Sequence, residues 1–593
     1  MKQKLKEIWG KADDIFVRYP MILTMALIAA LSAVVAIEMD NAVNQFSVIK
    51  LIFTACLGIS VMFAVKMLSQ RIGKRMLLEL GALAFLTGFY FILPEKEKDF
   101  TEMYAFILIP TYILSHLLVS FIPFFGQNRE LKFWQYNKNL FINIFLTAVF
   151  TGVLVGGVML AILAVDKLFE FNFEETLYPK TFSFLAIFGS CFIFLLFGDR
   201  GLQQLEKDGN YPQILKFFTQ YVLIPLLLIY VLILYFYSFK ILINWELPRG
   251  WVSYLILAYS VVGILALLLV HPLREEGAKS WVKMFSKAFY YTLAPLIILL
   301  FTAIFTRILE YGYTEPRYFV LLVALWLTTV VLYFIFVRNG SIRFIPVSLF
   351  VFGMFSLVFP YFNALSVSKR SQKNELEKVL SRHKLTDNGK IDFTKRVSAK
   401  TVDEVADKFN FLQQRGEDEY LDLFLSVTQI NELNQQKQNQ LYRNVRGKVA
   451  GFFKNVDQNR HNRQRTEIYT PKLVYRTEGY QYVSKLNHFS ENMNQGGPTI
   501  NGDKIVLINR LQQNRPVFEI SLNGKETVNL LPFVEKKLAA YASQTDRIPV
   551  DEISTEVNFE KYKVKIIFEN LVRETSGKTR YYFNDGFMLI KER

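Results

Sequence analysis

The chain has 593 residues, of which 52% are hydrophobic and 55 are phenylalanine, and its formal net charge is +16. Nearly all long apolar runs lie before residue 362. That part is too hydrophobic for a soluble core, because apolar runs of about 17 to 25 residues are what α-helices need to cross a bilayer. Both cysteines lie inside such runs, which excludes a disulfide framework and a cysteine zinc site.

Residues 1–20 are basic and lack the small-residue cleavage pattern of a signal peptide, so they are predicted to be a cytoplasmic N-terminal segment. Residues 21–361 are predicted to form a transmembrane helical domain with about 11 spans. The predicted spans cover residues 21–37, 48–65, 77–93, 103–123, 140–163, 182–197, 218–238, 251–270, 288–306, 318–337 and 344–360.

Lysine and arginine are unevenly divided between the segments that connect these spans. Alternate segments, counted from the N-terminus, carry 21 of these residues, whereas the segments on the other side carry 8. Basic residues favour the cytoplasmic side of short loops. The N-terminus is therefore predicted to be cytoplasmic, and the chain after residue 361 is predicted to be extracytoplasmic.

Polar groups in or near the predicted spans are the first candidates for function, because a polar side chain in hydrocarbon needs a partner or water. Glu79, His116 and Asp166 are candidates for a ligand or ion pathway, and each has a structural alternative, a hydrogen bond in the bundle or a solvated loop. Asp199 and Arg200 are expected to form an interfacial ion pair. His271 begins "HPLREEGAKSW", which we interpret as a helix leaving the bilayer on the cytoplasmic side, with a titrating role for His271 as the alternative.

Three glycines in "FTGVLVGGVML" form a small-residue face on the fifth predicted span. Gly152, Gly156 and Gly157 are spaced so that another helix could approach this face closely. We expect that the face serves helix packing.

Residues 365–593 contain no apolar run long enough to span and are predicted to be an extracytoplasmic α+β domain, helical to about residue 455 and strand-rich from about 470. In "EKYKVKIIFEN", apolar residues alternate with lysines, which is typical of a strand with one buried face. Asn523-Gly524 predicts a tight hairpin turn. "LPFVEKKLAAYAS" predicts a helix between strands.

Basic residues lie on the second predicted helix of this domain and in the charged tail that follows it. They are candidates for contact with anionic lipid headgroups or with a protein partner in the envelope, and the alternative is a solvated face. These residues are Arg443, Arg446, Lys448, Arg463 and Arg465. Nucleic-acid binding is not expected, because the domain is predicted to lie on the far side of the membrane.

No catalytic signature argues for an enzyme. "SGKTR" has the Gly-Lys-Thr of a phosphate loop, but the glycine required five positions earlier is Val572. None of the five histidines begins a zinc-protease helix motif, and no nucleophile elbow is present. We expect neither a cofactor nor a metal, and enzyme activity stays open.

One segment resembles a known family. The stretch "YVLIPLLLIYVLILYFYSFKILINWELPRGWVS", together with its continuation to Glu276 and "TDNGKIDF" at 386–393, is similar to the bacterial domain-of-unknown-function 4153 family, in a long form with a C-terminal soluble domain. The resemblance implies a multi-pass protein of the bacterial inner membrane. It supplies no reaction, cofactor or site residue.

Three functional hypotheses follow. The first is transport or lipid handling in the cell envelope, through the spans. The second is a non-enzymatic membrane-anchored sensor or assembly scaffold that binds a partner through its periplasmic domain. The third is a membrane-embedded transferase acting on a lipid-linked substrate, for which Asp166, Glu170, Glu174 and Glu175 provide only a sparse acidic cluster, with a solvated acidic loop as the alternative.

Overall fold

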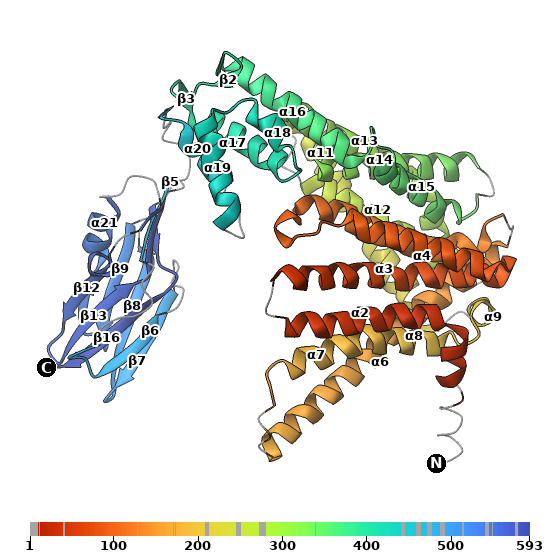
Figure 1. The fold of residues 1–593 in the computed structure, drawn as a ribbon, viewed down its shortest axis with the longest axis horizontal. Helices are drawn as coiled ribbons and strands as arrows, with labels where there is room; N and C mark the ends of the chain where they lie inside the picture. The colour runs from red at the N-terminus through yellow and green to blue at the C-terminus, as the bar shows by residue number, and fades with distance from the viewer. Residues whose placement is uncertain are drawn as a thin grey trace. The chain divides into compact units, whose positions relative to one another are not determined.

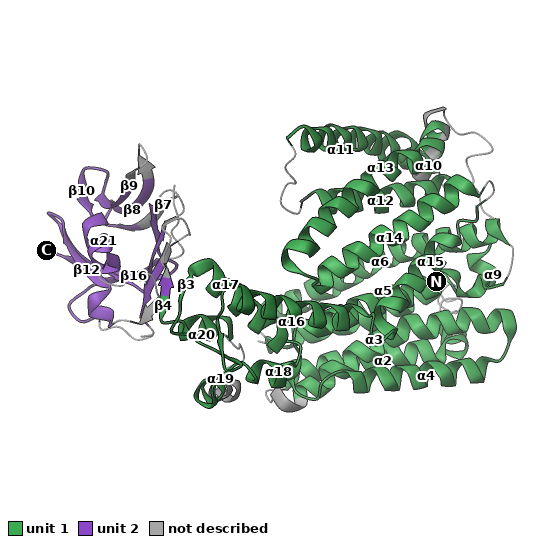
Figure 2. Cartoon of the chain, turned by 90° about the horizontal axis from the view of Figure 1, so that it is seen from above, with its two compact units in different colours: residues 1–455 green, residues 456–593 purple. Residues whose placement is uncertain are grey.

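The computed structural model divides the chain into two compact units, residues 1–455 and 456–593 (Figure 2). Each unit is described by itself. The structure describes residues 10 to 593 except for short segments. These are residues 11, 40–41, 127–128, 170, 172, 208–212, 245–250, 272–279, 338–339, 440–444, 458–463, 471–476, 487–492, 513–514, 540–544, 548 and 576–578.

The first unit is built from long apolar helices (Figure 1). Ten helical segments of the described chain are long and apolar enough to cross a membrane, and α15 (Phe344–Val358) is a further apolar helix of 15 residues. These eleven segments coincide in order with the eleven predicted spans, and the predicted fold class is confirmed. The other helices here are α2 (Pro20–Glu38), α3 (Ala42–Ile72), α4 (Arg75–Ile92), α5 (Ala105–Phe121), α6 (Glu130–Phe169), α7 (Leu177–Phe184), α8 (Ser190–Phe197), α9 (Leu202–Leu205), α10 (Gln213–Phe218), α11 (Ile224–Asn244), α12 (Trp251–Val270), α13 (Ser280–Tyr311) and α14 (Glu315–Phe336).

The spans form two groups, each with its own core. The first group comprises α2 to α8, and the second comprises α11 to α15. Helices α2, α3 and α4 of the first group lie side by side in both views (Figures 1 and 2). The groups meet where α15 packs against α5 and where α12 approaches α6; Leu268 of α12 contacts both cores. We call this boundary the seam.

A small helical layer follows the last span within the same unit. It contains α16 (Ala364–Arg382), the hairpin of β1 (Thr386–Asp387) and β2 (Lys390–Ile391), β3 (Arg396–Ser398), α17 (Ala399–Gln413), α18 (Asp418–Asp422), α19 (Val427–Asn439) and α20 (Val445–Phe452). The predicted domain boundary at 365 therefore falls inside the first unit, and the expected helical part packs with the spans instead of with the strands.

A buried ion pair fixes this layer to the spans. Arg415 donates two hydrogen bonds to Glu315 at the start of α14, at 2.6 and 2.8 Å, and the exposed fractions of the two side chains are 3% and 0%. Gln372 of α16 donates to the carbonyls of Tyr311 and Tyr313, just before α14. The layer is thus held by polar contacts that pair every charge it buries there.

The second unit is strand-rich and has a core of its own residues. Its four-stranded sheets have the orders β10-β9-β8-β7, β11-β5-β14-β15 and β12-β13-β16-β6. The elements are β5 (Gln464–Tyr469), β6 (Tyr482–Leu486), β7 (Met493–Ile500), β8 (Asp503–Gln512), β9 (Arg515–Leu522), β10 (Glu526–Asn529), α21 (Leu531–Ala539), β11 (Thr545–Arg547), β12 (Ser554–Asn558), β13 (Tyr562–Phe568), β14 (Asn570–Thr575), β15 (Thr579–Tyr582) and β16 (Gly586–Glu592), after β4 (Asn455–Asp457) at the unit boundary.

Local sequence signals in this unit are confirmed. The alternating stretch at 562–568 is β13, and its buried positions alternate until the fully buried end of the strand. Asn523 and Gly524 join β9 to β10 with φ values of 53° and 69°, the left-handed conformation that this turn requires. The helix predicted from "LPFVEKKLA" is α21.

Candidate functional site

Three cavities lie along the seam between the two helix groups. Residues of α5 and of α15 line each of them. Their volumes are about 530, 310 and 240 Å³. We call them the large cavity, the Trp134 cavity and the Arg343 cavity. The first two fall within the range of about 300 to 1,000 Å³ that is typical of small-molecule sites.

The large cavity lies between α3, α4, α5 and α15, and its far end is closed by the first residues of α16. Its walls are almost entirely apolar. The polar lining groups are engaged in local hydrogen bonds: Thr111 donates to the Ile107 carbonyl, Ser356 donates to the Gly353 carbonyl, and Asn363 caps α16 by accepting from the Ser366 amide. The cavity therefore offers apolar contact more than it offers free polar groups.

Several residues that line the large cavity are exposed at the surface of the helical unit. Ile92 of α4 and Val358 of α15 line it and have exposed fractions of 57% and 58%. Phe85 lines it as well and is also exposed. A chain from the hydrocarbon phase could enter between α4 and α15 without crossing the polar layer.

The Trp134 cavity lies between α5, α6, α12 and α15. The indole nitrogen of Trp134 donates to the Leu268 carbonyl at 2.7 Å, which links α6 to α12. Lys138 also lines the cavity; it is buried, and its ammonium group lies 5.1 Å from the centroid of the Trp134 ring. Asn137 donates to the Ser120 carbonyl of α5 at 3.1 Å. This cavity combines apolar walls with a cation.

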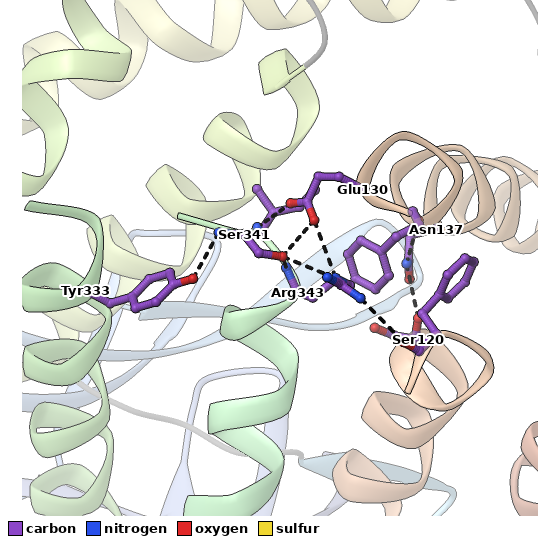
Figure 3. Close-up of polar contacts among 9 residues, drawn as sticks. Ser120, Glu130, Asn137, Tyr333, Ser341 and Arg343 are labelled. Atoms are coloured by element: carbon purple, nitrogen blue, oxygen red, sulfur yellow. Dashed lines mark hydrogen bonds and ion pairs between the residues drawn. The ribbon is translucent and has the colours of Figure 1, made fainter. Parts of the chain in front are cut away.

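The Arg343 cavity is bordered by a polar network that ties the start of α6 to the turn before α15 (Figure 3). The carboxylate of Glu130 accepts hydrogen bonds from the Ser341 hydroxyl at 2.6 Å and from the Ile342 amide at 2.5 Å. It also forms an ion pair with Arg343 at 3.4 Å. Because Glu130 belongs to the first helix group and Arg343 to the second, this network bridges the seam.

The other contacts in Figure 3 extend this bridge. Arg343 donates to the Phe124 carbonyl at the end of α5, at 3.4 Å. The Tyr333 hydroxyl accepts from the Ser341 amide at 3.0 Å, and its ring stacks on Phe344 with centroids 3.9 Å apart. Helices α5, α6, α14 and α15 are thus connected at one end of the seam.

The structure places the predicted pathway residues apart from the three cavities, none of which they line. Glu79 forms an ion pair with Arg75, one turn earlier on α4, at 2.7 Å. His116 is exposed, and its Nδ1 lies 2.8 Å from the Tyr112 carbonyl. Asp166 accepts from the Phe173 amide at 2.9 Å and lies 3.4 Å from Lys167. Each has a local partner, and a role for these residues in a ligand or ion pathway stays a prediction.

The predicted interfacial residues differ in their contacts and surroundings. Asp199 accepts hydrogen bonds from Arg18 and Tyr19 through its backbone carbonyl, which joins the chain before α2 to the end of α8. An ion pair between Asp199 and Arg200 is absent among the described residues. His271 follows α12 and is half-buried, and the "PLREEGAK" that comes after it lies outside the described residues.

Among the basic candidates after residue 440, Arg443 and Arg463 lie outside the described residues. Arg446 forms ion pairs with Asp407 at 2.7 Å and with Asp403 at 3.5 Å, and Lys448 donates to the Glu432 carbonyl at 3.1 Å. Arg465 belongs to β5, opposite Glu574 of β14. Two of these residues thus hold α20 against neighbouring helices. Contact with lipid or a partner stays a prediction.

Sequence reasoning missed the residues that form the seam. Glu130 is more than 200 residues from Ser341 and Arg343 along the chain. The hydropathy pattern identifies all three only as loop residues. The signal available in the sequence was weak: one acidic residue at a predicted helix start and one basic residue in a short turn. Glu315 and Arg415 were missed for the same reason.

Many apolar helices of spanning length, with cavities between them, define the chain as a multi-pass helical membrane protein. The model of the domain of unknown function DUF4153 matches residues 25–407, more than half of the chain. The chain belongs to this family. The match includes every span except the first few residues of α2, and it extends over α16 and most of α17.

A relative is the uncharacterized protein PM1469 of Pasteurella multocida (strain Pm70), which is 27% identical over 281 residues. The aligned part covers 46% of this chain and 46% of the relative, so the chain spans about half the length of the curated relative that it matches. No solved structure matches the chain.

Proposed function

We propose that this protein handles phospholipid in the bacterial inner membrane and that the large cavity holds an acyl chain of a membrane lipid. The observation that carries this proposal is an apolar cavity of about 530 Å³ that opens between α4 and α15. The surrounding phase is hydrocarbon, and an acyl chain that enters the cavity exchanges contacts with other lipids for contacts with equally apolar walls, at little cost in free energy.

The lining supports a lipid better than a polar solute. An ion or a sugar would need several unengaged polar groups to replace its water, and the hydroxyl and amide groups of the lining already bond within their own segments. Glu79 and His116, the residues that would favour ion transport, have partners outside this cavity. The same features therefore support lipid handling over ion transport.

The proposed orientation has the N-terminus in the cytoplasm and the second unit in the periplasm. The excess of lysine and arginine in alternate loops supports it. With this orientation, the large cavity lies in the outer half of the bilayer, because it is lined by the end of α4 and the start of α5.

Two alanines on α4 provide a matched test of the cavity. Ala82 is buried and lines the large cavity, whereas Ala84 is exposed on the same helix. The full-length protein is extracted in native lipid discs, exchanged into detergent, and its retained lipid is measured by mass spectrometry. We expect Ala82→Phe to reduce retained phospholipid and Ala84→Phe to leave it unchanged, because only the first new ring fills the cavity.

Met354→Trp is a second cavity variant, at the opening, in case Ala82→Phe does not fold. The proposal would be contradicted if both cavity variants retained as much phospholipid as the unsubstituted protein. It would also be contradicted if the unsubstituted protein held no more lipid than the detergent micelle alone.

A further inference from the structure

Two of the seam cavities lie at different depths along the same pair of helices. The large cavity is lined by α5 from Phe106 to Leu118, and the Trp134 cavity is lined by Leu117 and Ser120. On α15, which runs antiparallel to α5, the corresponding residues are 350–358 and 345–349. The middles of the two α5 linings are about seven residues apart, or roughly 10 Å at 1.5 Å per residue, which is a third of the hydrocarbon thickness of about 30 Å.

The division between these cavities consists of apolar side chains. Leu117 and Leu118 are neighbours on α5 but line different cavities, as do Leu349 and Phe350 on α15. The Phe350 ring contacts the buried Phe121 ring edge-on, with centroids 5.3 Å apart. No charged residue lines either cavity at this division among the described residues. Leu118 and Phe350 are therefore the large-cavity side chains that lie nearest to this division in the sequence.

Both cavities also open to the membrane. The exposed residues of the large cavity lie on α4 and α15, while Phe141 of α6 and Leu265 of α12 line the Trp134 cavity with exposed fractions of 50% and 42%. Acyl chains could thus stay in the hydrocarbon phase while a headgroup moves along the seam. Such an arrangement removes the need to enclose a whole lipid, which these volumes would not hold.

A buried cation in the Trp134 cavity suits a phosphate headgroup. The hydroxyls of Thr111 and Ser115 in the large cavity donate to carbonyls of α5, whereas the ammonium group of Lys138 lies in the wall of the Trp134 cavity. An anionic group in the middle of a bilayer is costly unless polar partners or water accompany it. The buried cation would lower that cost in the direction of Lys138.

We infer that the seam is a path for transbilayer movement of phospholipid, with the large cavity and the Trp134 cavity as its two stations and with Leu118 and Phe350 as the side chains that separate them. The inference rests on the proposed function and adds to it, since lipid could occupy the large cavity without ever crossing to the Trp134 cavity.

The experiment uses the purified full-length protein in vesicles of phosphatidylethanolamine and phosphatidylglycerol that contain a fluorescent phospholipid in both leaflets. An external reductant that does not cross the bilayer quenches the outer label. We expect the protein to make inner-leaflet label accessible, and protein-free vesicles to protect it. Phe350→Trp should slow the exchange roughly tenfold, a barrier higher by about 1.4 kcal/mol, because it thickens the division.

Val351→Trp is the matched control, since Val351 is next on α15 and is 59% exposed, away from the division. It should exchange lipid at the unsubstituted rate. Phe350→Ala, which thins the division, should exchange at least as fast as the unsubstituted protein, and it keeps the test valid if the tryptophan variant does not fold. Lys138→Gln should slow the exchange of the anionic phosphatidylglycerol more than that of phosphatidylethanolamine.

The failure of this inference is distinguishable from that of the proposed function. Transbilayer movement would be overturned if the inner-leaflet label stays protected in vesicles that contain the protein. Lipid binding would stand in that case if the unsubstituted protein retains phospholipid and the Ala82→Phe variant does not. Equal exchange rates for Phe350→Trp and Val351→Trp would overturn the path through the seam. In the first experiment, absence of retained lipid in the unsubstituted protein would overturn the proposed function itself.

Discussion

The pair Glu315 and Arg415 shows how one contact determines the position of a whole layer. The two residues are 100 positions apart, and both are almost completely buried. Arg415 also donates to the Phe411 carbonyl, and its guanidinium lies over the Phe411 ring, 3.4 Å from the centroid. A planar guanidinium that is bonded on two edges and stacked on one face has little rotational freedom. Its position therefore fixes the end of α17 against the start of α14.

Removing one member of this pair should loosen the helical layer from the spans. Arg415→Met leaves the Glu315 carboxylate buried without its partner, and breaking a buried pair in this way costs about 3 to 5 kcal/mol. We expect faster proteolysis within α16–α20 of the detergent-solubilised protein. The double variant Glu315→Leu with Arg415→Met should recover much of the protection, because it buries no charge. Equal protease sensitivity of Arg415→Met and the unsubstituted protein would show that other contacts hold the layer.

Glu417 should make the packing of α16 within the helical layer sensitive to acid. Burial alone would raise the pKa of Glu417, but the ammonium groups of Lys373 and Lys369, at 2.6 and 3.0 Å, outweigh it and lower the pKa below the usual value. A carboxyl whose pKa is lowered by folding stabilises the folded state above its unfolded pKa, and this stabilisation is lost as the pH falls through the folded pKa.

Glu417→Gln should therefore lower thermal stability at pH 7 and have little effect once the pH is below the folded pKa of Glu417. The expected difference at pH 7 is within about 1 kcal/mol, as for partly exposed ion pairs. Thermal unfolding of both proteins in detergent across this pH range measures it. Parallel curves for the two proteins at every pH would contradict the assignment.

At the scale of elements, the eleven apolar segments were predictable because hydrocarbon forces a backbone to satisfy its hydrogen bonds within a helix. The way in which these segments pack against one another was not predictable from the sequence. The glycine face on α6 was expected to pack, yet a side chain at Gly152, Gly156 or Gly157 would meet nothing within 4 Å among the described residues. Close approaches occur instead at Gly58 of α3, Gly353 of α15 and, most tightly, Gly263 of α12, and the sequence pattern around these residues does not distinguish them from other glycines in spans.

Alanine at Gly263 should disturb the packing of α12 on α13. Its methyl group would lie 2.1 Å from an edge atom of the Phe289 ring, which is 1% exposed and so cannot move into free space. Overpacking of this kind costs about 1 to 3 kcal/mol. Thermal unfolding in detergent should show a lower midpoint for Gly263→Ala and no decrease for Gly156→Ala. A decrease of the same size in both variants would point to helix propensity instead of packing.

The seam could not have been predicted from the sequence either. Its cavities depend on how α5 and α15 meet, and these helices are more than 200 residues apart in the chain. Single-sequence patterns report the local exposure of a segment and carry no information about such partners. In contrast, the β9–β10 turn and the alternation in β13 were predicted correctly, because each depends only on neighbouring residues.

At the scale of the whole molecule, the division at residue 455 separates a unit with membrane-spanning helices from a unit whose core is entirely its own. The family match ends at residue 407, within the first unit. The strand-rich unit is thus distinct in packing from the spans and their α16–α20 layer, and it lies outside the family match, as do α18, α19 and α20. The sensor or scaffold hypothesis would concern the second unit, and the lipid proposal concerns the first.

The proposed orientation predicts where each unit is accessible. An odd number of spans places the two ends of the chain on opposite sides of the membrane. In spheroplasts, an external protease should degrade the second unit and spare a tag at the N-terminus, and both should be cut after the membrane is permeabilised. Protection of the second unit in intact spheroplasts would reverse the orientation or remove one span.

Helices of very unequal length face the membrane in the first unit. Residues 139–165 of α6 contain no charged side chain, and these 27 residues extend about 40 Å, whereas the 15 residues of α15 extend only about 22 Å. A bilayer has a hydrocarbon thickness of about 30 Å, so α6 must tilt or be surrounded by a thicker bilayer, and α15 must be surrounded by a thinner one or be extended by its flanking residues. The length difference that tilt does not absorb would make the bilayer thicker beside α6 than beside α15.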